Sequence, residues 1–410
     1  MLLSDWPNAV AHVDADCFFA ACEIARRPEL RASPVCVMSS QDACIVAKTY
    51  DAKAKGINTG MPVWEAKKLM PHAVYLPADF AYYGQMSDKL FAILARYSPE
   101  VEVYSIDEGF VGMNGIRSLW RRGFAEIADM IRAAVKHEVG ITVSIGISVT
   151  KTLAKIASES RKPDGTTLVP GRDILAFLAG VDVQEIPGIG RNRAALLNKF
   201  RLFTAADYAR AAPGLIQRLL GKAGRDLWHE LRGTPRFALE LTPRLPKSVA
   251  RTASLGKVTG DRAIIAAHLS YHTTRLAAEL VSKHYLARRL TVFLTLKSFA
   301  AESLETRFDD ATANVFRLSQ AVRDSLARLY RSGELYRGCG VIATEITPMA
   351  ERSLDLFGNV REDERKEKLM TTMDALNRKY GNHTIAMLAA IPAIKHKKRS
   401  RFRLPMYETN

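Results

Sequence analysis

The chain has 410 residues, 48% of them hydrophobic and 25% charged, which is a globular composition and excludes collagen-like and intrinsically disordered proteins. No run of 18 apolar residues occurs, so we expect neither a membrane-spanning helix nor, given Asp5, Asp14 and Asp16 near the start, a secretory signal peptide. The formal net charge of +16 lies in residues 170–410, because residues 1–169 contain 19 basic and 19 acidic residues; we expect a neutral catalytic part and a part that binds a polyanion.

The first 169 residues interleave expected strands and helices. Strands are expected at 8–14, 35–38 and 141–148, and helices at 17–27, 63–70, 81–96 and 119–137. Residues 101–106 and 110–111 form an expected hairpin that carries Asp107 and Glu108 at its tip. This order predicts an α/β or α+β sheet domain. The five cysteines lack a CxxC pair, which predicts reduced thiols in a cytoplasmic protein and no zinc site.

The remaining residues divide into further modules. Residues 170–236 have the pattern of short helices, and residues 237–249 include Pro243 and Pro246 and predict an extended linker. Residues 250–349 predict a second α+β module, with helices at 262–281 and 312–329 and a strand in which Leu290, Val292 and Leu294 alternate with polar residues. Residues 350–410 are expected to form a tail that ends in a basic run.

The sharpest candidate site is acidic. Asp14 ends one expected strand, and Asp107 and Glu108 lie at the tip of the hairpin. If the strands are neighbours, three carboxylates converge, and such a group needs a cation. Two Mg²⁺ ions about 4 Å apart would suit oxygen ligands and phosphoryl transfer. The alternative is acids satisfied by turns or caps, as Asp16 could be at the start of the next helix.

The sequence motifs around these acids resemble those of a known protein family. His12–Glu23 (HVDADCFFAACE) closely resembles the first motif of Y-family DNA polymerases, and Ser105–Glu108 (SIDE) resembles the second. Val46–Lys53 resembles the family's fingers motif, and Val143–Ala157 its last palm strand and helix. The resemblance covers residues 1–350 well and the remainder more weakly.

The resemblance implies an α+β multidomain right hand. It comprises a ferredoxin-like palm (1–21 and 80–169), small fingers (22–79), a helical thumb with a helix–hairpin–helix (170–236), a linker (237–249), an α/β little finger (250–349) and a C-terminal tail (350–410). No proofreading domain is expected.

The resemblance also implies roles for individual residues. Asp14, Asp107 and Glu108 match the catalytic, metal-binding acids, and the carbonyl of Ala15 matches the group that completes one metal's shell. Two Mg²⁺ ions are implied, with Mn²⁺ as a substitute. Phe19 matches the steric gate, whose ring excludes a ribose 2′-hydroxyl; Phe18 fits nucleotide contact and core packing equally well.

Tyr50, Lys53 and Lys162 match contacts to the nucleotide triphosphate, which requires cations and donors around its phosphates. The family commonly has Arg where this chain has Lys53, and Lys supplies a point charge in place of a bidentate fork. Gly109 stands where Ala or Ser is usual, but this change removes no ligand.

Two regions are candidate DNA contacts. Ile186–Gly190 (IPGIG) resembles a helix–hairpin–helix turn, in which Gly188, Gly190 and Arg191 would hold a phosphate; the alternative is a simple helix–helix turn. In the expected little finger, Thr291, Lys297, Arg251 and Arg289 would line a face that follows phosphates, unless this face is merely solvated.

The tail carries two further resemblances. Ser353–Phe357 (SLDLF) resembles the peptide by which bacterial polymerases bind the sliding clamp, with Leu354, Leu356 and Phe357 as its apolar contacts. Residues 366–389 resemble the C-terminal extension of the polymerase V catalytic subunits, whereas the front of the chain matches the polymerase IV and V branches equally. Lys395–Arg403 would bind DNA or merely keep the tail soluble.

The function expected is low-fidelity translesion synthesis in a cytoplasmic DNA-damage (SOS) response. The partners would be primer–template DNA, deoxynucleoside triphosphates, the clamp and either a recombinase filament or an accessory subunit, with no membrane involved. The alternative is a non-catalytic, polymerase-like DNA-binding scaffold of a mutagenesis complex. The complete set of acids favours the enzyme.

Overall fold

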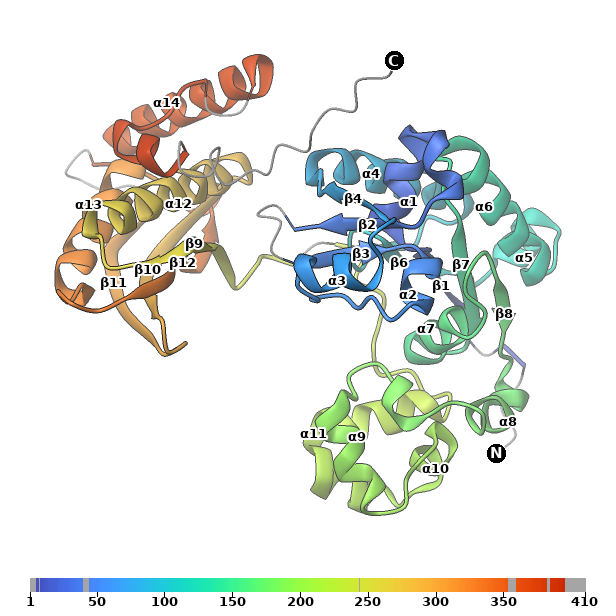
Figure 1. Ribbon diagram of the computed structural model, residues 1–410. Helices are drawn as coiled ribbons and strands as arrows, with labels where there is room; N and C mark the ends of the chain where they lie inside the picture. Colours follow the sequence, from blue (N-terminus) through green and yellow to red (C-terminus); the bar gives the residue numbers. More distant parts are fainter. Residues whose placement is uncertain are drawn as a thin grey trace. The chain divides into compact units, whose positions relative to one another are not determined.

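The computed structural model describes residues 5–6, 8–39, 44–242, 244–352, 359–381 and 384–394. The chain divides into two compact units, residues 1–243 and 244–410, and Figure 1 labels most of their helices and strands. None of the helices in this described part combines the length and apolar character that a membrane span requires.

The first unit is built on a five-stranded sheet with the order β5-β6-β1-β7-β8. Its strands are β1 (Val10–Ala15), β5 (Val101–Val103), β6 (Glu108–Gly112), β7 (Val143–Ser148) and β8 (Thr166–Leu168). The central strand β1 is antiparallel to both β6 and β7. The predicted strands at 8–14 and 141–148 and the predicted hairpin are therefore neighbours in one sheet.

Helices cover both faces of this sheet (Figure 1). Helices α1 (Phe18–Arg26), α4 (Phe80–Tyr97) and α6 (Phe124–Glu138) share a core with alternate residues of β1 such as Ala11 and Val13. Helix α7 (Lys151–Glu159) contacts β7 and β1. Because successive strand residues point to opposite faces, His12 and Asp14 face α7.

The helix expected at 119–137 is interrupted. Helix α5 (Ile116–Trp120) ends at Arg121, whose φ of 51° is left-handed. Helix α6 starts afresh after Gly123, whose N–H donates to the side chain of Glu126 at 2.8 Å. A left-handed residue and a new N-terminal cap end one helix and start another.

A smaller sheet follows α1 in the chain, with the order β3-β2-β4. Its strands are β2 (Val35–Met38), β3 (Ile45–Lys48) and β4 (Val74–Pro77), and its connections contain η1 (Pro28–Ala32), α2 (Tyr50–Ala54) and α3 (Val63–Leu69). Cys36, Ile45, Ile57 and Tyr75 are buried in its own small core.

The short helices predicted after residue 170 pack against α7. They are η2 (Gly171–Asp173), α8 (Ile174–Leu178), η3 (Val183–Glu185), α9 (Arg191–Asn198), α10 (Ala205–Arg210) and α11 (Pro213–Leu231). Leu153 and Ile156 of α7 lie in the same core as these helices. The segment predicted as linker is anchored at its start, because Phe237 N–H donates to Glu230 at 3.0 Å and Glu240 N–H to Glu102 at 2.9 Å.

The second unit is a four-stranded sheet with the order β11-β10-β12-β9, packed against helices. Its elements are β9 (Ser248–Thr259), α12 (Arg262–Ser282), β10 (Tyr285–Leu296), β11 (Ala301–Thr312), α13 (Val315–Leu329) and β12 (Tyr336–Pro348). Leu290, Val292 and Leu294 are fully buried, which confirms the predicted alternation in this strand.

The described part of the predicted tail is folded onto this unit. After η4 (Met349–Glu351), helix α14 (Asn359–Tyr380) and η5 (Leu388–Ala390) contact α12. Asp363 of α14 is buried and accepts hydrogen bonds from Thr312 (2.9 Å), Asn314 (2.7 Å) and Arg317 (3.0 Å). Residues 359–381 are thus a docked element, because apolar contacts and a buried polar network hold them to α12 and α13.

Candidate active site

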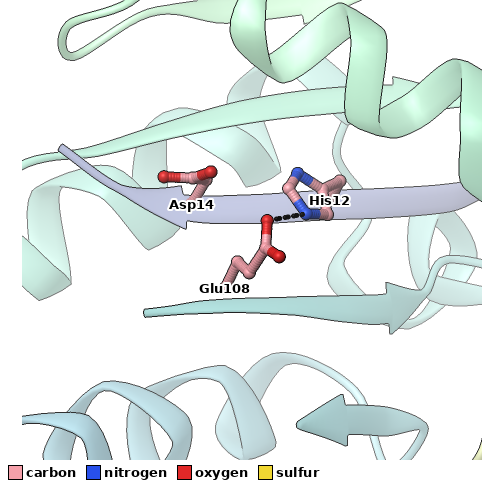
Figure 2. Close-up of side chains that lie close together, drawn as sticks. All are labelled: His12, Asp14 and Glu108. Carbon is pink, nitrogen blue, oxygen red and sulfur yellow. Dashed lines mark hydrogen bonds and ion pairs between the residues drawn. The ribbon is translucent and has the colours of Figure 1, made fainter. Parts of the chain in front are cut away.

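Strand pairing creates an acidic site on the α7 side of the first sheet. Asp14 of β1 lies directly opposite Glu108 of β6, and ligand atoms of Asp14, Glu108 and His12 all lie within 4.8 Å of one another. Figure 2 shows Asp14 and His12 on β1 with the side chain of Glu108 reaching toward them. The convergence predicted for Asp14 and Glu108 is therefore present.

The Asp107 side chain is held separately from that group. Its carboxylate accepts a hydrogen bond from the hydroxyl of Ser105, while its backbone carbonyl accepts from Ala15 N–H at 2.9 Å. Asp107 and Ala15 are thus tied together through the backbone, beside the paired strand ends. The predicted strand at 101–106 stops at Val103, and Ser105 shapes the turn by accepting from the N–H groups of Asp107 and Glu108.

Two lysines neutralise the acids. Lys162 Nζ lies 2.7 Å from Asp14 Oδ1 and 3.0 Å from Glu159, and Lys155 of α7 forms an ion pair with Glu108 Oε2. Burial raises the pKa of Asp14 to about 7, although Lys162 opposes this shift. Burial alone would also raise the pKa of Glu108, but hydrogen bonds from His12 and Lys155 lower it to about 2.

This set of groups fits divalent cations. Buried carboxylates on adjacent strands repel each other unless positive charge lies between them, and here ammonium groups supply it. Asp14, Glu108, Asp107 and the carbonyl of Ala15 offer the oxygen ligands that hard cations prefer. His12 and Lys155 were not expected at the site. The sequence signal for His12 was its position two residues before Asp14 on one strand, which places both side chains on the same face. Lys155 reaches the site because α7 packs directly on the sheet.

Asp16 has a structural role. It accepts from Ser144 Oγ and from Asp164 N–H, both at 2.8 Å, and no side-chain bond from Asp16 caps α1. The cap considered for Asp16 is therefore absent. Cys17 turns the chain into α1 with a left-handed φ of 49°, a conformation that costs free energy in non-glycine residues and clusters at functional sites.

The two phenylalanines that follow differ in exposure. Phe18 is 3% exposed and lies in the main core. Phe19 is half-buried; its ring stacks on Tyr83 at a centroid distance of 4.6 Å and meets Phe80 edge-on at 5.6 Å. The ring of Phe19 therefore packs against two other aromatic rings.

The candidate triphosphate contacts come from two segments. Tyr50 starts α2, and its hydroxyl donates to Asp16 Oδ1 at 3.4 Å. Burial raises the pKa of Tyr50, so the phenol stays a hydrogen-bond donor. Lys53 lies one turn later on α2 and is exposed. Lys162 lies beside Asp14. Both segments therefore contact the end of β1, α2 through the bond from Tyr50 to Asp16 and the segment of Lys162 through Asp14.

The candidate phosphate-binding turn lies at the start of α9. Gly188 has a φ of 88°, and its carbonyl accepts from Arg193 at 2.8 Å. A shallow depression of about 520 Å³ is lined by Gly188, Gly190, Arg191, Asn192 and Arg193. Glycine at 188 is required, since a side chain disfavours positive φ.

The candidate DNA contacts of the second unit are unequal. Arg251 is on the helix-covered side of its sheet and pairs with Glu279 of α12, and Arg289 pairs with Glu305 (2.6 Å) and Glu345 (2.7 Å). Lys297 is exposed and Thr291 half-exposed. The candidate clamp residues Leu354, Leu356 and Phe357 and the basic run 395–403 lie outside the described residues.

Comparison with known proteins agrees with this geometry. Residues 13–159 match the impB/mucB/samB family, and residues 246–356 match the C-terminal domain of that family. DNA polymerase IV of Dehalococcoides mccartyi is 30% identical, with 91% of this chain and 95% of that protein covered. A solved Y-family DNA polymerase chimera of Dbh and Dpo4 is similar with a TM-score of 0.70 and 25% identity, covering 83% of this chain and 99% of that one. The chain belongs to the Y family of DNA polymerases.

This Y-family chain is also 30% identical to the protein ImpB of Salmonella typhimurium, with 90% of each chain covered. Its residues 367–410 match a domain of unknown function. These matches confirm the family and the activity that the motifs predicted. The chain is a DNA-directed DNA polymerase of the translesion type, and the family implies dependence on divalent metal.

Proposed function

We propose that Asp14, Asp107 and Glu108 carry nucleotidyl transfer from a deoxynucleoside triphosphate to a primer 3′-hydroxyl. The observation that carries this proposal is the pairing of Asp14 with Glu108 across adjacent strands, each with a lysine at its carboxylate. A scaffold without catalysis would not need two buried acids held together in this way, since their repulsion costs stability.

The metal proposed is Mg²⁺, with Mn²⁺ as a substitute, held by Asp14, Asp107, Glu108 and the carbonyl of Ala15. When bound, two such ions would lower the pKa of the attacking hydroxyl and neutralise the pyrophosphate. The protein's own part is to keep the four oxygen ligands on one sheet edge. The hydrogen bond from Ala15 N–H to the Asp107 carbonyl ties the two strand ends that carry them.

The triphosphate is proposed to bind Lys162, Tyr50 and Lys53. Their donors would replace water around the phosphates, and cations near a transferred phosphoryl group stabilise the charge that develops there. Phe19 is proposed as the gate against ribonucleotides, because Tyr83 and Phe80 leave its ring little freedom to move aside. Phe18 would then support Phe19 from the core.

We also propose which parts of the structure correspond to the subdomains of a right-hand polymerase. The large sheet with α1, α4, α6 and α7 would be the ferredoxin-like palm, the three-stranded sheet the fingers, the helices of 170–236 the thumb, and the second unit the little finger. Template and primer are proposed to contact Gly188, Gly190 and Arg191 in a helix–hairpin–helix. In the little finger they would contact Thr291 and Lys297, and to a smaller extent Arg251 and Arg289, whose charges are already paired.

Further partners are proposed from the sequence alone. The sliding clamp would bind through Leu354, Leu356 and Phe357, and a recombinase filament or accessory subunit would assist. The site of action would be the cytoplasm.

Primer extension tests the central proposal. With Mg²⁺, a primed template and four deoxynucleotides, the protein should extend the primer, while Asp14→Asn and Glu108→Gln should each lose at least about 10³-fold in kcat, since their carboxylates are required in the reaction. Asp88→Asn, at an exposed position of α4, is the matched control and should retain full activity. Equal activity of Asp14→Asn and this control would refute the assignment.

A further inference from the structure

His12 is a buried polar residue that none of the proposed steps uses. It is 0% exposed and lies on β1, two residues before Asp14. Its Nε2 lies 3.1 Å from Glu108 Oε2 and its Nδ1 lies 2.7 Å from Ser158 Oγ on α7. Both ring nitrogens are therefore engaged, one by a proposed metal ligand and one by a buried hydroxyl.

The identity of the partners fixes which atom donates. Glu108 is a carboxylate and can only accept, so Nε2 must carry a proton for the contact to be favourable. A neutral ring then has no proton on Nδ1, so in this form the Ser158 hydroxyl, which also lies 2.8 Å from the Lys155 carbonyl, turns its single proton toward Nδ1. The opposite tautomer would turn a lone pair toward the carboxylate. Glu108 thus selects the ring form that donates to it, and Ser158, whose hydroxyl can donate or accept, holds the ring at Nδ1.

The contact also selects which oxygen of Glu108 remains available. Within the described part of the chain, His12 and Lys155 both contact Oε2, and no hydrogen bond or ion pair reaches Oε1. Figure 2 shows one carboxylate oxygen facing the ring and the other turned away from it. A carboxylate held by one oxygen presents the other in a fixed direction.

We propose that His12, held by Ser158, is a positioning residue that fixes the orientation of the Glu108 carboxylate beside Asp14, where the proposed cation would bind. The inference rests on the proposed function of Glu108 and adds two residues to it. Groups that hydrogen-bond to metal ligands fix their orientation, and their loss costs about 10–100-fold in metal affinity or activity. Phe110, whose ring lies 4.7 Å from the imidazole, packs beside this pair.

The test compares His12→Gln, His12→Leu and Ser158→Ala. Glutamine keeps an N–H that can donate to Glu108 and an oxygen that can accept from Ser158, whereas leucine keeps neither. Mn²⁺ binding is measured by electron paramagnetic resonance in complexes with a dideoxy-terminated primer, its template and the next deoxynucleotide, so that no reaction occurs. We expect His12→Leu to bind Mn²⁺ about tenfold more weakly, His12→Gln to remain within about threefold of wild type, and Ser158→Ala to fall between them.

Turnover supplies a second readout. In His12→Leu, kcat should fall about tenfold. The KM for deoxynucleotide and the Kd for DNA should stay within about twofold, because Ser158 and His12 are proposed to contact neither ligand. Ser148→Ala is the matched control: it removes another buried hydroxyl of the same sheet, bonded to the Val169 carbonyl, and should leave Mn²⁺ affinity unchanged.

Wild-type Mn²⁺ affinity in His12→Leu would overturn the proposal, as would a loss in His12→Gln as large as in His12→Leu. If His12→Leu fails to fold, as judged by its melting temperature, Ser158→Ala and His12→Gln decide. Equal Mn²⁺ affinity of Ser158→Ala and Ser148→Ala would then overturn the role of Ser158 in holding His12. A wild-type protein that extends no primer would refute the proposed function instead, and Mn²⁺ affinities of the variants would still decide the role of His12.

Discussion

The ammonium group of Lys162 lies 2.7 Å from the Asp14 carboxylate, so a candidate triphosphate contact and a candidate metal ligand neutralise each other. Lys162→Ala removes one of the two lysine ammonium groups that are proposed to contact the triphosphate. We expect the KM for deoxynucleotide to rise at least about tenfold, because a charge-assisted contact to a phosphate oxygen is lost. Steady-state insertion of one nucleotide measures this. Lys89→Ala, at an exposed position of α4, is the control, and an equal KM in both variants would contradict the assignment.

Sugar selection should depend on Phe19. In Phe19→Ala the ring that would meet a 2′-hydroxyl is gone, so the ratio of deoxyribonucleotide to ribonucleotide insertion should fall by roughly 10²-fold. Competing single insertions of each nucleotide measure the ratio. Phe80→Ala removes only one of the two rings that hold Phe19 in place and should lower the ratio by less than Phe19→Ala; unchanged selectivity in Phe19→Ala would show that Phe19 is not the gate.

The packing of α7 on the sheet should depend on Gly146. A Cβ at this position would lie 2.1 Å from the Ala154 carbonyl oxygen and 2.2 Å from the Ser158 nitrogen, so α7 would have to shift. We expect Gly146→Ala to lower the free energy of unfolding by about 1–3 kcal/mol and to reduce activity, because α7 carries Lys155 and Ser158. Gly84→Ala has no atom within 4 Å of the added carbon and should be neutral or slightly stabilising in urea unfolding.

Stability should depend on pH through Asp164. Burial alone would raise the pKa of Asp164, but hydrogen bonds from Arg132 and Lys136 lower it below its ordinary value. A lowered pKa in the folded state adds stability above the pKa of the unfolded chain, and this stability is lost as pH falls. Asp164→Asn should therefore cost about 1 kcal/mol at pH 7, and the difference from wild type should shrink below about pH 4.

Urea unfolding at pH 7 and pH 3 checks this dependence. Asparagine tolerates the left-handed φ of 53° at position 164, so the substitution changes charge and not backbone. Asp129→Asn removes a more exposed partner of the same Arg132 and should have little effect at either pH. A pH-independent cost for Asp164→Asn would show that its charge is not the cause.

The docking of α14 should depend on Asp363. Asp363→Ala leaves Thr312, Asn314 and Arg317 without their buried acceptor, so α14 should lose about 1–3 kcal/mol of docking free energy. Faster amide hydrogen exchange at residues 363–376 measures the release. Glu364→Ala changes an exposed neighbour on the same helix and should leave exchange unchanged. Identical exchange in both variants would show that Asp363 does not hold α14, and would leave this role to apolar contacts and the Arg352–Glu367 ion pair.

Sequence patterns predicted the sheet strands well. The alternation around Leu290 is confirmed because a two-residue period leaves only one face for apolar side chains. The motif around Asp14 predicted its meeting with Glu108, which strand pairing confirms. The helix expected at 119–137 was wrong as one element, because a left-handed residue at Arg121 lies inside an otherwise helical pattern.

The family, the acidic pair and the buried face of the strand around Leu290 could all be inferred from the order of residues, because they depend on short motifs and on a two-residue period. The groups that surround these residues depend instead on how the elements pack. Lys155 and Ser158 reach Glu108 and His12 because α7 packs on the sheet. Arg251 is drawn to Glu279 because its strand side faces a helix, and the described part of the expected tail is folded because Asp363 finds three donors far away in the sequence. Such contacts depend on distances in space that no spacing along the chain encodes.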